Sequence, residues 1–344
     1  MDSVGGNKND TGKAFDEGDW MIDQFGRKID YLRISVTDRC NLRCVYCMPK
    51  SGIESLPHHE IMTFEEVIRL VKVASGLGIR KIKVTGGEPL VRKNLVFLIR
   101  ELREIPGIDQ VTMTTNGVLF DMYGEQLASA GLGGVNFSLD SLDAGTFLQI
   151  TGVDAFSKVL SAIKLSCRLG LKTKINCVPI REINGSSLRD LAGMARAYPV
   201  HVRFIELMPI GLGAKFTPIG NQYVLKMLIQ QYGKPRRVFS GLGNGPARYY
   251  NFPGFQGGIG FISAITEAFC ENCSRIRLTA EGKLKLCLHG EEETDLKTLL
   301  RAGVTDEKLQ ETLQELIFQK PRRHNFHDEA NGITDGRKMV QIGG

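Results

Sequence analysis

The chain has 344 residues, of which 42% are hydrophobic and 24% are charged, and its formal net charge is +6. This composition is typical of a soluble globular protein, and no apolar run reaches the roughly 18 residues that a membrane-spanning helix needs. We therefore expect a cytoplasmic protein with one large core, or with one core and an appendage. The net charge weakly favours anionic partners and does not by itself indicate nucleic acid.

The chain begins with a polar stretch rich in Gly, Asp, Asn and Lys, so we predict a disordered leader over residues 1–21. Beyond it, short β-branched runs alternate with amphipathic segments. The predicted strands are 31–37, 81–85, 110–115, 134–139, 172–178 and 202–207. The predicted helices are 63–77, 94–105, 122–130, 157–169 and 188–198. Thr63 and Glu66 have the spacing of a capping box at the start of the first helix.

Six strand–helix repeats of this length indicate a parallel sheet, either doubly wound or curled into an incomplete TIM-like barrel. We predict an α/β fold of the second kind, an incomplete (β/α)6 parallel barrel over residues 22–209. After Pro209, glycine and proline become frequent, and short alternating runs appear between residues 248 and 288. Residues 210–344 are therefore expected to form a C-terminal extension with a small antiparallel region that covers the barrel.

The loops that follow the predicted strands carry chemically distinctive residues. In parallel sheets, functional groups gather at the carboxyl ends of the strands. These loops contain Cys40–Cys47, Gly86-Gly87-Glu88-Pro89, Asn116-Gly117, Asp140-Ser141 and Met208-Pro209. We expect them to face one common site.

Six of the eight cysteines form two triplets. Thiolates suit zinc and iron–sulfur clusters, and three thiolates leave one corner of a four-iron cluster open for a substrate or cofactor. Clustered cysteines in a chain without a secretory signal indicate metal rather than disulfides. The first triplet has the spacing C-x₃-C-x₂-C, and the second has the spacing C-x₂-C-x₁₃-C: Cys40, Cys44 and Cys47, then Cys270, Cys273 and Cys287.

The first triplet, with Tyr46 before its last cysteine, and the Gly-Gly-Glu-Pro loop together resemble the radical S-adenosylmethionine (SAM) family. The second triplet, Arg275, Arg277 and the terminal Gly343-Gly344 are similar to the branch of this family that cyclises GTP in the first step of molybdenum cofactor biosynthesis. This resemblance covers residues 22–344. It implies a lyase with two 4Fe–4S clusters, one on each cysteine triplet, with SAM as cofactor and GTP as substrate.

The resemblance also implies a reaction and its site residues. A 5'-deoxyadenosyl radical from SAM would take the hydrogen from C3' of GTP, and closure onto C8 would lead to 3',8-cyclo-7,8-dihydro-GTP. SAM contacts are expected at Tyr46, Gly87, Ser138 and Met208. GTP contacts are expected at Arg33, Lys83, Thr114, Lys174, Arg275 and Arg277. Catalytic roles are expected for Arg275, Arg277 and Arg203.

The basic residues in this set suit a triphosphate, because guanidinium groups bind phosphate bidentately and a cation inside a barrel needs an anionic partner. Lys83 stands where the family often has arginine, which leaves bidentate binding there open. The Gly343-Gly344 tail is expected to enter the site. The resemblance further implies a one-electron donor protein and transfer of the product to cyclic pyranopterin monophosphate synthase, and it allows a homodimer. No membrane or nucleic acid is expected as a partner.

Two other functions fit part of the pattern. A different two-cluster radical SAM enzyme, such as a peptide modifier, would usually carry more than three cysteines in the second region. A zinc-stabilised nucleic-acid-binding protein would use His289 with the second triplet and His58 or His59 with the first. Aromatic residues make up only 8% of the chain, however, and stacking aromatics interleaved with basic clusters are not evident.

Overall fold

The computed structural model describes residues 20–238, 245–290, 293–324, 326 and 338–342. Most of the predicted leader lies outside this range, although Met21 is described and is buried. The strands of the first part are β1 (Tyr31–Ser35), β2 (Lys81–Thr85), β3 (Gln110–Thr115), β4 (Gly134–Ser138), β5 (Lys172–Cys177) and β6 (His201–Ile205). The helices of this part are α1 (Phe64–Gly76), α2 (Leu95–Glu104), α3 (Phe120–Ser129), α4 (Ala144–Thr151), α5 (Phe156–Arg168) and α6 (Leu188–Ala197).

The second part of the chain consists of shorter elements. Its strands are β7 (Arg236–Val238), β8 (Arg248–Asn251), β9 (Ile259–Ile262), β10 (Arg275–Leu278), β11 (Lys283–Lys285) and β12 (Thr294–Asp295). Its α-helices are α7 (Asn221–Tyr232), α8 (Leu296–Arg301) and α9 (Asp306–Phe318), and a 3₁₀ turn forms at Met339–Gln341. None of the described helices is long and apolar enough to cross a membrane.

All these strands form one sheet in the order β12-β11-β10-β1-β2-β3-β4-β5-β6-β9-β8-β7. From β1 to β6 each strand is parallel to the next, as the strand–helix alternation predicts. The sheet differs from the prediction at both edges, because β10 pairs in parallel with β1 and β9 pairs in parallel with β6. Antiparallel pairing involves β7, β8, β11 and β12. The antiparallel pairs predicted for the extension are therefore present, and they continue the main sheet at both of its edges.

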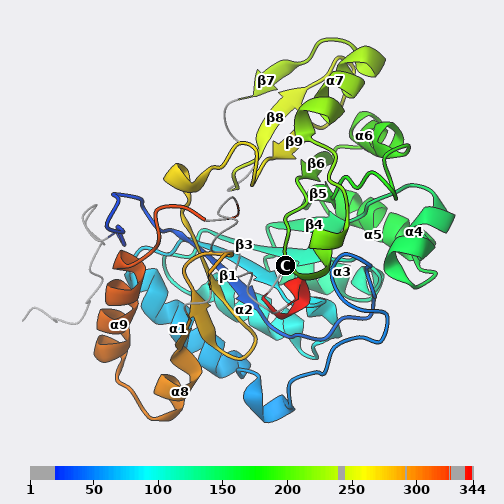
Figure 1. Cartoon of the computed structure of the whole chain (residues 1–344). Coiled ribbons are helices and arrows are strands. Elements are labelled where there is room, and N and C mark those ends of the chain that lie inside the picture. The colour runs from blue at the N-terminus through cyan, green and yellow to red at the C-terminus, as the bar shows by residue number, and fades with distance from the viewer. Residues whose placement is uncertain (1–19, 239–244, 291–292, 325, 327–337, 343–344) are drawn as a thin grey trace, which may run out of the picture.

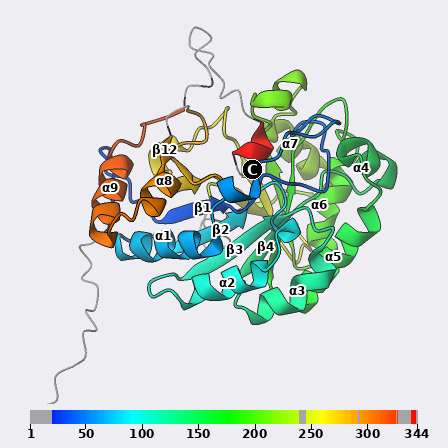
Figure 2. The same ribbon diagram turned by 90° about the horizontal axis from the view of Figure 1, so that it is seen from below.

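Helices cover the outer face of this curved sheet, and the C-terminal segment lies at its inner side (Figures 1 and 2). The apolar side chains of the helices and the outward-facing strand residues form one continuous core. Helix α1 illustrates the local logic: Val67, Leu70 and Val71 recur at helical spacing and are buried. The predicted capping box is present, since the Thr63 hydroxyl accepts from the Glu66 N–H and the Glu66 carboxylate accepts from the Thr63 N–H.

The join between β6 and β9 requires a glycine. At Gly257, just before β9, a Cβ atom would lie 1.8 Å from the carbonyl oxygen of Val200. The Gly257 N–H also donates to the carbonyl of Ala195 at 2.8 Å, so the backbone cannot move away without losing this bond.

We expect Gly257→Ala to lower the free energy of unfolding by about 3 kcal/mol or more, because overpacking against backbone cannot relax through a side chain. Urea unfolding monitored by circular dichroism would measure this. The control is Gly76→Ala at the end of α1, where the added Cβ meets nothing within 4 Å. That variant should be as stable as the parent or slightly more stable, and equal effects at both positions would contradict the close approach.

Candidate active site

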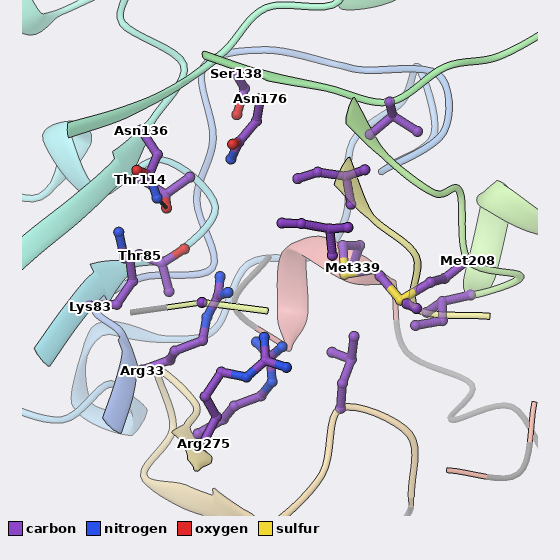
Figure 3. Close-up of a pocket in the computed structure, with 18 of the residues that line it drawn as sticks. Arg33, Lys83, Thr85, Thr114, Asn136, Ser138, Asn176, Met208, Arg275 and Met339 are labelled. Atoms are coloured by element: carbon purple, nitrogen blue, oxygen red, sulfur yellow. Dashed lines mark hydrogen bonds between the residues drawn. The ribbon is translucent and has the colours of Figure 1, made fainter. Parts of the chain in front are cut away.

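One cavity of about 590 Å³ runs along the inner face of the sheet, from the amino ends of the strands, at Tyr31, Gln110 and Lys172, to the loops at their carboxyl ends. Every residue that the sequence analysis assigned to a cluster, to SAM or to GTP lines it, except the terminal Gly343-Gly344, which lies outside the described residues. Basic side chains such as Arg33, Lys83 and Arg275 gather on one side of the view in Figure 3. Met208 and Met339 lie on the other side, with Ser138 and Asn176 at a third.

The first cysteine triplet lies in the loop after β1, where the Cys47 N–H donates to the Cys44 carbonyl at 2.9 Å. Burial raises the pKa of all three thiols: that of Cys40 is raised, that of Cys44 lies well above its usual range and that of Cys47 is about 12. Buried thiols of this kind ionise only when a positive charge compensates them. Three such thiols facing one cavity fit an iron–sulfur cluster, which supplies that charge and leaves an iron open.

The Gly-Gly-Glu-Pro loop after β2 packs directly against the cysteine loop. A Cβ on Gly87 would lie 2.4 Å from the carbonyl oxygen of Arg39, so only glycine fits there. The absence of a side chain at Gly87 thus lets the backbone of this loop pack closely against the backbone of the cysteine loop. Gly87 also lines the cavity. The Gly87 N–H donates to the carbonyl of Thr37 at 2.7 Å, which fixes the two loops together.

Glu88 of the same loop was assigned no role from the sequence. Its carboxylate is buried and accepts hydrogen bonds from the N–H groups of Leu90 (3.0 Å) and Asn116 (2.6 Å) and from the Thr115 hydroxyl (2.7 Å). The Asn116 side-chain amide in turn donates to Asn41 Oδ1 at 2.8 Å and to Cys40 Sγ at 3.9 Å. Glu88 therefore connects β3 to the first cysteine, and its pKa is raised by burial to about 7 despite these donors.

Tyr46, in the cysteine loop, is fixed by Asp140, which follows β4. Its hydroxyl donates to Asp140 Oδ2 at 2.6 Å, and the Val178 N–H donates to Asp140 Oδ1 at 2.7 Å. Burial raises the pKa of Asp140 to about 6. Because Asp140 follows β4 and Val178 follows β5, this contact ties the cysteine loop to the middle of the sheet. Ser138 lies beside it on β4, in register with Asn176 of β5.

A row of basic side chains crosses the sheet. Arg277 of β10, Arg33 of β1 and Lys83 of β2 are direct neighbours in the strand register. Further along, Thr114, Asn136 and Lys174 form a second row across β3, β4 and β5. These positions lie on the concave face, so the predicted triphosphate ligands do converge.

Arg203 of β6 joins this set. Its Nε donates to Asn176 Oδ1 at 2.9 Å. Next to it, Gly260 of β9 gives the Arg203 side chain room, since a Cβ there would lie 3.0 Å from Arg203 Cγ.

Among these cations Lys83 and Arg277 are buried, and Arg33 and Lys174 are half-buried. Burial lowers the pKa of Arg33 to about 10 and that of Lys174 to about 7, and it brings the pKa values of Lys83 and Arg277 well below their usual range. Neighbouring positive charges lower each value further. Arg277 Nη1 is buried and has no hydrogen-bond partner in the described part of the chain. Such a cluster calls for a multiply charged anion.

The acidic residues that line the cavity, Glu88, Asp140 and Glu206, accept hydrogen bonds from backbone N–H groups. Glu206, for example, binds the N–H groups of Ile265 (2.7 Å) and Thr266 (3.0 Å). These three carboxylates are thus bound to backbone N–H groups of the loops. The side chains of the two rows therefore remain available to bind an anionic ligand.

The second triplet lies on the other side of the basic row. Cys270 and Cys273 precede β10, and Cys287 follows β11. Burial raises the pKa of Cys273, but the charges of Arg275 and Lys320 outweigh it and bring the pKa to about 7. Arg275 lies over the ring of Phe269 at 4.7 Å. Lys320 lies in the cavity wall, and no sequence pattern pointed to it.

The histidines of the zinc alternative take other roles. His289 packs against Phe326, with ring centroids 4.4 Å apart, and His58 Nε2 contacts Arg39 Nη1 at 3.0 Å. His59 is exposed. Among the residues that the structure describes, no group of three His, Cys, Asp or Glu side chains is arranged to hold a single metal ion.

The hydrogen bonds of the Glu88 carboxylate should contribute to the stability of the protein. We expect Glu88→Gln to lower the free energy of unfolding by about 1–3 kcal/mol, because the amide nitrogen would meet backbone donors where the carboxylate accepts. Chemical denaturation would measure the difference. Glu125→Gln, at an exposed position on α3, is the matched control and should change little. An unchanged stability of Glu88→Gln would show that the carboxylate is not needed to join the loops.

The two parts of the chain match two family models: "Radical SAM superfamily" over residues 34–195 and "Molybdenum Cofactor Synthesis C" over residues 200–326. Among solved structures, Streptococcus suis SuiB bound to S-adenosylmethionine aligns with a TM-score of 0.58 at 16% identity, covering 85% of this chain and 69% of that one, which shows a shared fold.

Curated relatives are much more similar. The GTP 3',8-cyclase of Desulforamulus reducens is 48% identical and that of Syntrophomonas wolfei is 47% identical, each over 94% of this chain and 100% of the relative. The cavity with its cysteine triplets and basic rows agrees with this similarity. The chain belongs to the GTP 3',8-cyclase family of radical SAM enzymes.

Proposed function

We propose that this chain binds GTP and SAM together in the cavity and converts GTP to 3',8-cyclo-7,8-dihydro-GTP, the first step of molybdenum cofactor biosynthesis. The observation that carries this proposal is the cluster of buried and half-buried cations that lines the cavity together with two cysteine triplets: Arg33, Lys83, Lys174, Arg203 and Arg277. GTP supplies close to four negative charges, which such a cluster requires. The reaction makes the enzyme a lyase.

The first triplet would hold the 4Fe–4S cluster that every radical SAM enzyme uses, and the second would hold another. When bound, SAM supplies the 5'-deoxyadenosyl radical that takes the hydrogen atom from C3' of GTP. The resulting C3' radical closes on C8, and one electron and one proton complete the dihydro product. Tyr46, Gly87, Ser138 and Met208 would orient SAM.

The cations divide into two groups by position. Arg33, Lys83, Lys174 and Arg203, with the Thr114 hydroxyl, would bind the triphosphate. Arg275 and Arg277 lie on β10, next to the second triplet, and would hold the guanosine part against its cluster. There they would act on the reacting nucleotide together with Arg203. The Gly343-Gly344 tail would complete the site, because the turn Met339–Gln341 that precedes it lies at the inner side of the sheet (Figure 1).

The reaction needs partners of defined chemistry. A one-electron donor protein would reduce the first cluster, and the product would pass to cyclic pyranopterin monophosphate synthase. The free, clustered cysteines suit a reducing compartment, so we propose that the protein acts in the cytoplasm. A homodimer is compatible with this assignment.

For the domain organisation we propose the boundaries that the sequence predicts. Residues 1–21 would be a leader, residues 22–209 an incomplete (β/α)6 barrel and residues 210–344 the extension with the second cluster. This is supported by the unbroken order of β1 to β6 and by the change to short strands after β6.

Anaerobic reconstitution with iron and sulfide, followed by dithionite, SAM and GTP, tests the function directly. We expect about eight iron atoms per chain, 5'-deoxyadenosine and a cyclised GTP product by mass spectrometry. Cys44→Ala should abolish SAM cleavage, whereas Cys273→Ala should retain some cleavage but lose cyclisation. Full turnover of either variant would contradict the cluster assignment, and 5'-deoxyadenosine without any change in GTP would show that the substrate is wrong.

GTP affinity should depend on pH through Lys174. Because the pKa of this half-buried lysine is lowered to about 7, its positive charge is present below pH 7 and lost as the pH rises. We expect the dissociation constant of GTP to rise by about tenfold between pH 6 and pH 8, the loss of about one charge-assisted contact. Isothermal titration calorimetry of the reconstituted enzyme would measure it.

Lys174→Arg, which stays charged, should bind tightly at both pH values, and Lys174→Met should bind weakly at both. Lys164→Met, at an exposed position on α5, is the control and should follow the parent. The same pH slope in Lys174→Met as in the parent would exclude Lys174 as its source.

A further inference from the structure

Two buried cations that the proposed mechanism does not use lie next to the second triplet. Lys320 is 2% exposed and Arg27 is 7% exposed, although both residue types are normally at the surface. Lys320 Nζ donates to the carbonyl of Arg275 at 2.9 Å and to the carbonyl of Leu286. It thereby joins β10 to the segment that carries Cys287.

Arg27 acts on the other end of the triplet. Its Nη1 donates to the carbonyl of Cys270 at 2.8 Å and to that of Arg322 at 2.9 Å, and its Nη2 donates to the carbonyl of Pro321 at 2.7 Å. Its Nε is paired with the fully buried carboxylate of Asp23 at 2.5 Å. Arg27 therefore fastens the segment that contains Lys320 to the cysteine loop.

Together the two cations reach a backbone carbonyl beside each cysteine of the triplet. Arg27 binds the carbonyl of Cys270 itself, and Lys320 binds those of Arg275, two residues after Cys273, and of Leu286, directly before Cys287. Three chain segments that are far apart in the sequence are thus held in one arrangement.

The two cations differ in their charge partners. Arg27 is balanced by Asp23. Lys320 is paired with no carboxylate in the described part of the chain, and the groups that act on it are Cys273 and Cys287 together with the cations Arg27 and Arg275. Among the described residues, the groups near Lys320 that can offset its charge are therefore Cys273 and Cys287 of the triplet.

We propose that Lys320 is a positioning residue of the second cluster site, which holds the cysteine-bearing segments together and places a positive charge beside the cluster. The inference rests on the proposed function, which assigns a 4Fe–4S cluster to this triplet. A fixed positive charge favours the more negative, reduced state of a cluster, so Lys320 should raise its reduction potential.

The test compares the reconstituted full-length parent with Lys320→Met, Lys320→Arg and Lys297→Met. Lys297 is a matched control, because its Nζ donates to a backbone carbonyl, that of Glu60, at 2.8 Å outside the cavity. Potentiometric titration followed by electron paramagnetic resonance measures the reduction potential of each cluster, and a chelator assay measures the rate of iron loss.

In Lys320→Met, the potential of the second cluster should shift to a more negative value and its iron should be lost faster, with the first cluster unchanged. Lys320→Arg should restore most of the potential, and Lys297→Met should behave as the parent. An unchanged second-cluster potential in Lys320→Met would overturn the proposal, as would equal changes at both clusters.

A GTP cyclisation assay on the same proteins separates this inference from the proposed function. A parent protein with only one cluster would overturn the two-cluster assignment and the role of Lys320 with it. Two clusters, a shifted potential in Lys320→Met and no cyclisation of GTP would support Lys320 and refute the proposed reaction.

Discussion

The concentration of buried positive charge is the constraint on which the rest of this molecule depends. Arg33, Lys83 and Arg277 are neighbours on parallel strands, where no side chain can turn away from the next without leaving the concave face. Their mutual repulsion disfavours the fold unless an anion lies between them. The cation cluster therefore lowers the stability of the ligand-free protein, but it keeps the site organised before the ligand binds. The continuous apolar core on the outer face offsets this loss of stability.

The site is shared between the two parts of the chain in a way that neither could reproduce alone. β10 comes from the extension but pairs with β1, so Arg277 and Arg33 meet although they lie at opposite ends of the sequence. At the other edge, Gly260 of β9 makes room for Arg203 of β6. The extension, which was predicted to cover the barrel, thus also forms part of the cavity wall.

The sequence predicted the alternating core and the residues at the strand ends, because helical and strand periodicities and strand-end loops are local features. Asn176 was within reach too, since it lies two residues after Lys174 on the same strand and faces the same way. The pairing of β9 and β10 with β6 and β1 could not be inferred, because short alternating runs do not reveal distant partners. The position of Lys320 in the site could not be predicted either, because its hydrogen-bond partners are backbone carbonyls, which leave no pattern in the sequence.

The parallel pairing of β1 with β10 also has a consequence for how the molecule is made. During synthesis β1 emerges early and β10 late, so β1 remains an edge strand until most of the chain exists. An uncovered edge strand is a template for pairing with other chains. Cys270 and Cys273 immediately precede the strand that covers this edge. Assembly of the second cysteine site and protection of the nascent sheet from aggregation therefore depend on the docking of the same strand.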